Sequence, residues 1–90
     1  MLLETPAEMA LSAAERFRSL RKRKKISIKT LSERSGVAYS TLRRFESSGE
    51  ISFIALIKIA SVLDCDDQIN TLFSNTVPSS IEEILRENRR

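Results

Sequence analysis

The stretch SIKTLSERSGVAYSTLRRFE, residues 27–46, decides the expected fold because its spacing predicts two short helices joined by a tight turn. Ser27 is a favourable N-cap for the first helix, and Ile26 and Leu31 have the spacing of a hydrophobic staple around it. We therefore expect a helix of about two turns that ends at Gly36, because glycine readily adopts the left-handed conformation common at helix C-termini.

A second short helix follows the glycine. Val37 and Leu42 repeat the staple spacing around Ala38, and Leu42 and Phe45 are spaced to point toward the interior. Two short helices that cross at a glycine turn form a helix-turn-helix unit, whose second helix can lie in the major groove of DNA.

These residues also carry a family resemblance. The run LSERSGV at residues 31–37, followed by STLRRFE at residues 40–46 and by Gly49, resembles the Cro/CI-type (XRE) helix-turn-helix family of bacterial and phage repressors. Ser52 and the apolar stretch that ends at residues 60–63 match the fourth helix of that family. The expected fold is therefore all-α: a five-helix, lambda-repressor-like helix-turn-helix bundle with a short extra C-terminal helix.

The layout of nearly the whole chain is similar to that of the HipB-like antitoxins, regulators encoded beside HipA-type serine/threonine kinase toxins. The similarity covers residues 5–9, 41–46, 49–52, 72–73 and 80–85. It implies a HipA-type kinase toxin as a protein partner.

Two positions depart from the family pattern. Many members carry a glutamine at the first position of the second helix, where it clamps a phosphate. This chain has Ile28 there, so that contact is absent or is made by Lys29. Many members also have Ser or Thr as the N-cap of the recognition helix, where this chain has Ala38. Both departures concern docking on DNA and leave the fold unaffected.

Four polar side chains of the second helix are spaced to share its exposed face. Arginine bound bidentately to guanine O6 and N7 is the commonest specific base contact. In the resembling family, the positions that match Tyr39, Ser40 and Arg44 read bases. The predicted base-reading residues are Tyr39, Ser40, Arg43 and Arg44.

Some polar residues of this region have other expected roles. The alternative for Arg43 is a phosphate contact, and the alternative for Tyr39 is packing on the turn. Glu46 is predicted to be structural and to orient a basic side chain. The predicted phosphate contacts are Lys25, Lys29 and Thr41.

The charges are segregated along the chain although the net charge is only +3. Residues 16–44 hold eleven Lys and Arg against one acid, a balance of +10, whereas residues 45–85 hold one Lys against seven acids, a balance of −6. A cationic region that coincides with a helix-turn-helix indicates nucleic-acid binding, since phosphate neutralisation supplies most nonspecific affinity.

The N-terminal residues predict a long first helix. TPAE at residues 5–8 combines an N-cap, a first-position proline and a capping-box glutamate. The helix is expected to reach residue 24, although Ser12 offers a second capping box and hence a break. The basic run at residues 21–25 closes the helix, either as solvated charges that complement the dipole or as phosphate contacts. Its predicted apolar face consists of Met9, Ala13, Phe17 and Leu20.

After a turn at residues 47–50, the stretch from Ser52 to Leu63 predicts a helix that is apolar nearly all round and therefore buried at the centre of the bundle. Asp66 is the expected N-cap of a short fifth helix that reaches Phe73.

The acidic stretch at residues 64–67 is compared with a cation-binding loop. Its aspartates lack the glycine and the terminal glutamate of an EF-hand loop, so we interpret them as capping and solvated residues. Cys65, in the same stretch, is interpreted as a small packed apolar residue.

We expect residues 1–73 to form one helix-turn-helix domain and residues 74–90 a linker with a short helix and tail. The second part holds a capping box at residues 80–83 and a narrow apolar stripe. Such a helix is too short to persist alone in water, so it must dock on its own domain, on a second copy or on a partner protein. The predicted dimer or partner surface consists of Ile69, Leu72, Phe73, Ile81, Ile84 and Leu85.

The composition excludes several classes of protein. Ninety residues, 41% of them hydrophobic, suffice for one small domain. One cysteine and no histidine exclude an internal disulfide framework and a histidine or multi-cysteine zinc site, and we expect no cofactor. The longest apolar stretch, residues 51–63, is too short to span a bilayer, so we expect a cytoplasmic protein without membrane association. An enzyme is disfavoured because no nucleophile beside a base and no phosphate-cradling glycine loop is present.

The sequence therefore predicts a DNA-binding repressor that autoregulates its own operon as the antitoxin of a toxin–antitoxin system. A recognition helix with four readers covers only about half a turn of DNA, so we expect a homodimer on pseudo-palindromic half-sites roughly 34 Å apart. The alternative is an interaction protein whose main role is to bind and neutralise a HipA-type kinase toxin. The two roles are compatible.

Overall fold

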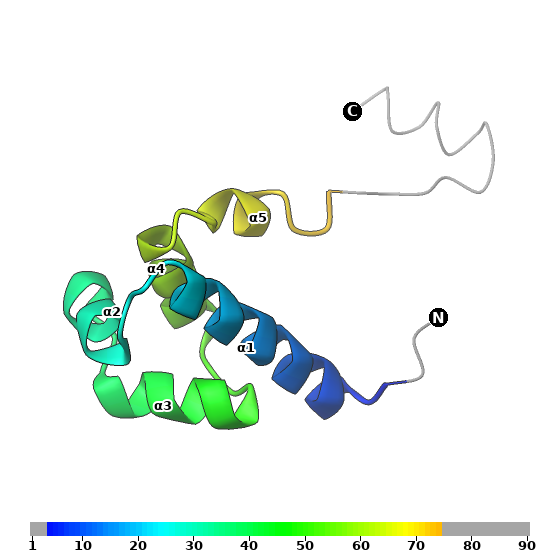
Figure 1. Cartoon of the computed structure of the whole chain (residues 1–90). Helices are drawn as coiled ribbons and strands as arrows, with labels where there is room; N and C mark the ends of the chain where they lie inside the picture. The colour runs from blue at the N-terminus through cyan, green and yellow to red at the C-terminus, as the bar shows by residue number, and fades with distance from the viewer. Residues whose placement is uncertain (1–3, 75–90) are drawn as a thin grey trace, which may run out of the picture.

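The computed structural model describes residues 4–74, which form five α-helices and no strand (Figure 1). α1 packs against α3, α2 packs against α3 and α4, and α4 packs against α5. The all-α prediction is confirmed for these residues, whereas the predicted C-terminal helix with Ile81, Ile84 and Leu85 lies outside them. The helices are α1 (Pro6–Arg23), α2 (Ile28–Ser35), α3 (Tyr39–Ser48), α4 (Phe53–Val62) and α5 (Asp66–Asn70).

The start of α1 forms the predicted capping box. The Glu8 backbone N–H donates to Thr5 Oγ1 at 3.1 Å, and the Thr5 backbone N–H donates to Glu8 Oε1 at 3.0 Å. These hydrogen bonds stabilise the carboxylate and lower the pKa of Glu8 below its ordinary value. The helix continues without a break at Ser12 and ends at Arg23, one residue before the predicted end.

The two helices of residues 27–46 are capped as predicted. Ser27 Oγ accepts the Thr30 N–H at 3.0 Å, and Gly36 ends α2 with a left-handed φ of 75°. Ala38 precedes α3 without a side-chain capping bond. The turn predicted at residues 47–50 is wrong in its first half, because α3 continues through Ser48 and ends at Gly49 with φ 82°.

Gly49 also lies where α3 approaches α1 most closely. A Cβ atom at this position would be 2.6 Å from the carbonyl carbon of Ala10 and 2.7 Å from the backbone nitrogen of Leu11. Both atoms belong to the backbone of α1, so neither can rotate away. Glycine is therefore required here by space as well as by its left-handed backbone.

The core joins four of the helices. Its largest fully buried side chains are Leu31, Leu42, Ile59 and Leu63, which come from α2, α3 and the end of α4. Burial of an aliphatic side chain of this size contributes roughly 1.5–3 kcal/mol. Phe17 of α1 meets Phe45 of α3 edge to face, with ring centroids 5.5 Å apart.

The buried face of α1 differs from the predicted one. Ala14 is fully buried and Phe17 is half-buried, whereas Met9 is 42% exposed and Ala13 is also exposed. Met9 is exposed because the N-terminal end of α1 extends past the end of α3 (Figure 1).

The prediction that α4 is buried all round is wrong. Phe53 is 54% exposed and Ile54 is 68% exposed, because α2 and α5 cover only part of the helix. The predicted extent of the fifth helix is also wrong: α5 ends at Asn70, and residues 71–73 form a turn. Asp66 is the first residue of α5 and not its N-cap, a place where its charge still complements the helix dipole.

Within residues 4–74, none of the helices has the length and apolar content needed to cross a bilayer.

Candidate nucleic-acid interface

α3 presents the predicted base-reading side chains to solvent. Tyr39 is 49% exposed, and Ser40, Arg43 and Arg44 are also exposed. The opposite side of the helix is anchored in the core by buried residues one turn apart, Leu42 and Phe45. This arrangement leaves one polar face of α3 free of the bundle.

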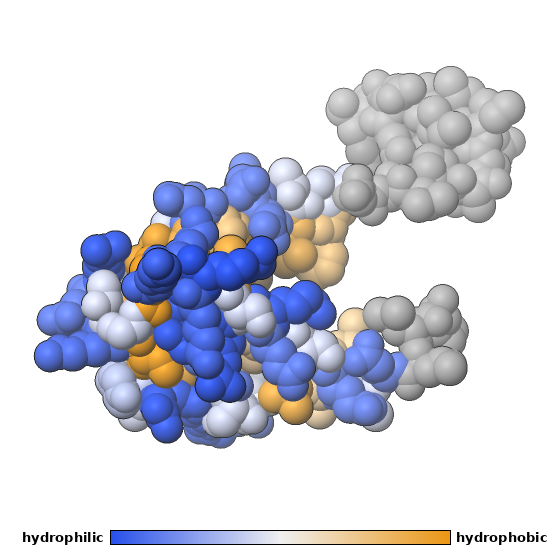
Figure 2. Space-filling view, in the orientation of Figure 1, coloured by the Kyte–Doolittle hydropathy of each residue, from blue (hydrophilic) through white to orange (hydrophobic). Residues whose placement is uncertain are grey.

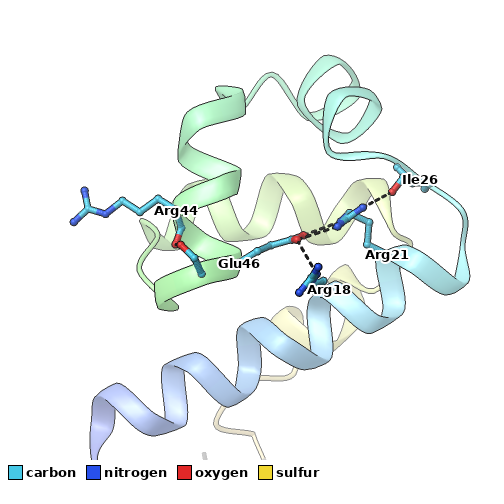
Figure 3. Close-up of polar contacts among 6 residues, drawn as sticks. Arg18, Arg21, Ile26, Arg44 and Glu46 are labelled. Carbon is cyan, nitrogen blue, oxygen red and sulfur yellow. Dashed lines mark hydrogen bonds and ion pairs between the residues drawn. The ribbon is translucent and has the colours of Figure 1, made fainter.

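Arg44 extends away from the bundle (Figure 3). Its guanidinium forms an ion pair with Glu50 at 2.5 Å, and the two side chains are 71% and 64% exposed. Exposed ion pairs of this kind contribute about 0–1 kcal/mol. Arg44 can therefore leave Glu50 for a more strongly charged partner at a small cost in free energy.

Glu46, on the inner side of α3, forms the bidentate ion pair shown in Figure 3. Arg21 Nε donates to Glu46 Oε2 at 2.7 Å, and a terminal nitrogen of Arg21 donates to Oε1 at 2.9 Å. The side chains are 9% and 7% exposed. The predicted structural role of Glu46 is thus confirmed. For Arg21, the prediction of a solvated charge at the end of the basic run is wrong, because its side chain is buried in this ion pair.

Arg21 connects three segments of the fold. It pairs with α3 through Glu46, and its other terminal nitrogen donates to the Ile26 carbonyl oxygen at 2.8 Å, in the connection to α2. Because Arg21 itself belongs to α1, one buried guanidinium fixes the position of the recognition helix against both of its neighbours. The side chain of Arg21 therefore orients the surface that would meet DNA.

A groove of about 510 Å³ runs beside this ion pair, between α1 and the C-terminal half of α3. Arg18 of α1 stands at its edge, 55% exposed, with Nε 3.8 Å from Glu46 Oε1. Ile28, half-buried, lines the groove where a polar residue is usual in the resembling family, so the side chain at that position offers no hydrogen bond. The lining residues are Arg18, Arg21, Ile28, Arg43, Arg44, Glu46 and Ser47.

The three residues predicted to contact phosphates differ in their exposure to solvent. Lys25 and Lys29 are exposed, while Thr41 is half-buried on the flank of α3. Lys25 follows α1 with a left-handed φ of 58°, which turns the chain toward α2. None of the three lines the groove between α1 and α3.

The predicted dimer or partner surface is exposed at the end of α5. Leu72 is 45% exposed, Phe73 is 90% exposed, and Ile69 is half-buried. Figure 2 shows an apolar area at this end of the molecule. Phe53 and Ile69 also line an apolar groove of about 610 Å³ between α1, α4 and α5.

Cys65 lies beside this second groove and is half-buried, as its interpretation as a packed residue requires. Its thiol lies 3.5 Å from the Ala60 carbonyl oxygen. Burial raises the pKa of the thiol, and Asp67 adds to the effect. Among residues 4–74, no three His, Cys, Asp or Glu side chains come together in a way that could hold a metal ion.

The sequence interpretation missed the roles of Arg18 and Arg21. A signal was present for Arg21, because it falls on the buried stripe of α1 at helical spacing from Ala14 and Phe17. The basic residues on either side of it concealed this signal. No local pattern distinguishes Arg18, whose position depends on the packing of α1 against α3.

The comparisons with known proteins agree with this geometry. A family model described as helix-turn-helix matches residues 17–69, which include the last seven residues of α1, all of α2 to α4 and most of α5. No curated protein and no solved structure is similar enough to this chain to extend the comparison.

Proposed function

The chain belongs to the Cro/CI-type (XRE) helix-turn-helix family of DNA-binding transcription regulators, and from this premise we propose that it represses its own operon by binding a specific operator. The observation that carries the proposal is the exposed face of α3. This face holds two arginines and a tyrosine, and its opposite side is fixed by Leu42, Phe45 and Glu46.

Within this proposal, Tyr39, Ser40 and Arg44 read bases in the major groove, Arg43 contacts a base or a phosphate, and Lys25, Lys29 and Thr41 contact phosphates. The exposure of the first four supports this division, because a base reader must reach beyond its own helix. Arg44 exchanges a solvated carboxylate partner for a guanine edge, a gain of roughly 1–3 kcal/mol of discrimination against the wrong base.

We also propose that the regulator is a homodimer on a pseudo-palindromic operator. Single exposed apolar residues are common, but Phe53, Ile54, Leu72 and Phe73 all lie on or beside α4 and α5, away from the face of α3. A second copy placed there would leave both recognition helices free for successive major grooves.

Sedimentation tests this surface. Leu72→Asp is expected to lower the sedimentation coefficient to that of a monomer without loss of helical content. Thr71→Asp places the same new charge on the adjacent exposed residue and is expected to leave the dimer intact. Equal sedimentation of both variants and the wild type would exclude α5 as the dimer contact.

The second candidate function is that of an antitoxin that neutralises a HipA-type kinase toxin. The exposed apolar area of α4 and α5 favours a protein partner as well as a second copy. Co-purification with the product of the neighbouring gene tests this role. Loss of that complex on removal of residues 75–90 would assign the contact to the C-terminal segment.

A reporter fused to the DNA upstream of the gene tests the regulatory role. Repression predicts that co-expression of the protein lowers reporter output and that Arg44→Ala abolishes the effect at equal protein level. Increased output would instead identify an activator. Unchanged output, with the protein folded and present, would refute autoregulation.

A further inference from the structure

The groove between α1 and α3 holds an excess of positive charge. Four arginines line it, Arg18, Arg21, Arg43 and Arg44, and Glu46 is the single carboxylate among the lining residues. Glu46 already engages Arg21 through both of its oxygens, at 2.7 and 2.9 Å. The buried pair is thus electrically satisfied, and Arg44 pairs with Glu50, which is not among the lining residues. Arg18 and Arg43 are the exposed arginines of the lining that remain.

Arg18 lies at the groove, and its guanidinium forms only a long contact with Glu46 among the described residues. Its one ion-pair contact within residues 4–74 is the 3.8 Å approach of Nε to Glu46, longer than a good charge-assisted hydrogen bond. Its side chain is 55% exposed, so the terminal nitrogens of its guanidinium are accessible to a ligand. Arg43, across the groove on α3, forms no ion pair with any described residue.

We propose that this groove is a phosphate-binding site and that Arg18, outside the helix-turn-helix itself, contacts one phosphate group of the DNA together with Arg43. The proposal rests on the proposed function, which it deepens by adding a backbone contact on α1. Guanidinium groups match the planar geometry of phosphate oxygens and bind them bidentately.

The position of the groove selects DNA as the source of the phosphate. Arg43 and Arg44 belong both to the groove and to the exposed face of α3. A major groove occupied by α3 is bordered by the sugar–phosphate strands, so a strand beside the C-terminal half of α3 would pass along this groove. Ile28 supplies no polar group there, and Arg18 provides the charge from the facing helix instead.

The test compares two variants that remove the same charge from the same helix. Arg16 lies two residues before Arg18, on the opposite side of α1 beside the α1, α4 and α5 groove, and it is also exposed. Binding of wild type, Arg18→Gln and Arg16→Gln to a fluorescein-labelled DNA duplex of random sequence is measured by anisotropy over a range of salt concentrations.

Loss of one phosphate contact makes the slope of log K against log salt shallower by about 0.9 per protomer. The affinity difference between wild type and Arg18→Gln should therefore narrow about 3.5-fold when salt is raised fourfold. Arg16→Gln should keep the wild-type slope, and Arg18→Lys should restore it because the charge is retained. Thermal unfolding of all variants reports whether the fold is intact.

The outcomes separate this inference from the proposed function. A shallower slope for Arg18→Gln alone supports the phosphate site. Equal slopes for Arg18→Gln and Arg16→Gln, with wild type binding the duplex, would overturn the site and leave DNA binding in place. Failure of wild type to bind any duplex would overturn both.

Discussion

Two glutamates at or just after α3 pair with arginine, one pair buried and the other exposed, so their removal is expected to lower stability by very different amounts. The Glu46 and Arg21 side chains are 7% and 9% exposed, whereas those of Glu50 and Arg44 are 64% and 71% exposed. The perturbation is the replacement of each glutamate by alanine. Both variants lose one carboxylate and a close ion pair with arginine, and Glu46→Ala also loses the longer 3.8 Å contact with the exposed Arg18. Burial is therefore the main difference between them.

Glu46→Ala leaves a buried guanidinium whose remaining partner is the Ile26 carbonyl oxygen. Removal of one member of a buried ion pair costs about 3–5 kcal/mol, because the other charge is left desolvated and uncompensated. A domain of this size has a total stability on the order of 5–13 kcal/mol. Glu46→Ala is therefore expected to remove roughly a quarter or more of this stability, and Glu50→Ala about 0–1 kcal/mol.

Urea denaturation followed by far-UV circular dichroism measures both losses. The comparison is valid if the dependence of the free energy of unfolding on urea is the same for each variant. The double variant Arg21→Met, Glu46→Leu provides a further control, because it removes both buried charges. It is expected to be more stable than Glu46→Ala.

The reasoning is refuted if Glu46→Ala is no less stable than Glu50→Ala. That result would mean that solvent reaches Arg21 once the carboxylate is gone, and that Arg21 does not hold α3 against α1 and the connection to α2.

Three further effects follow from the helix ends. Gly49→Ala should destabilise the fold by several times more than Gly36→Ala in urea denaturation. Both positions are left-handed, a cost of about 1–2 kcal/mol for alanine, but only Gly49 faces the backbone of another helix. Ala38→Ser should raise the melting temperature, since it gives α3 the capping bond that it lacks, worth about 0.5–2 kcal/mol. The folded-state pKa of Glu8 is lowered, so its contribution to stability is present above the ordinary value of 4.5 and is lost as the pH falls through the folded-state pKa. The difference in melting temperature between wild type and Glu8→Gln should therefore shrink as the pH is lowered below 4.5, and a constant difference would contradict this assignment.

The helices that carry the candidate site could be predicted because their limits are set by neighbouring residues. Ser27 and Gly36 delimit α2 through bonds and backbone angles within a few positions of the chain. The same applies to the face of α3, where Leu42 and Phe45 determine which side is buried. Local spacing was sufficient for these elements.

The predictions from sequence are wrong or incomplete where burial and ion pairing depend on contacts between parts of the chain that are distant in sequence. Phe53 and Ile54 belong to the apolar stretch that predicts a buried helix, but the small α5 does not extend far enough to cover them. Arg21 meets Glu46 across 25 positions of sequence, a pairing that depends on how α1 crosses α3. The groove with Arg18 has the same origin, so charge counts along the chain indicated a cationic region without locating the site.

The central claim, that the exposed face of α3 reads a specific operator, is tested most directly by fluorescence anisotropy. Wild type and Arg44→Ala are titrated with DNA from immediately upstream of the gene and with a scrambled duplex, at several salt concentrations. The account predicts that wild type prefers the upstream DNA and that Arg44→Ala loses mainly this preference while it keeps binding to both duplexes. Equal, weak binding of both proteins to both duplexes, with the same salt dependence, would contradict it and leave the basic region as a nonspecific electrostatic surface.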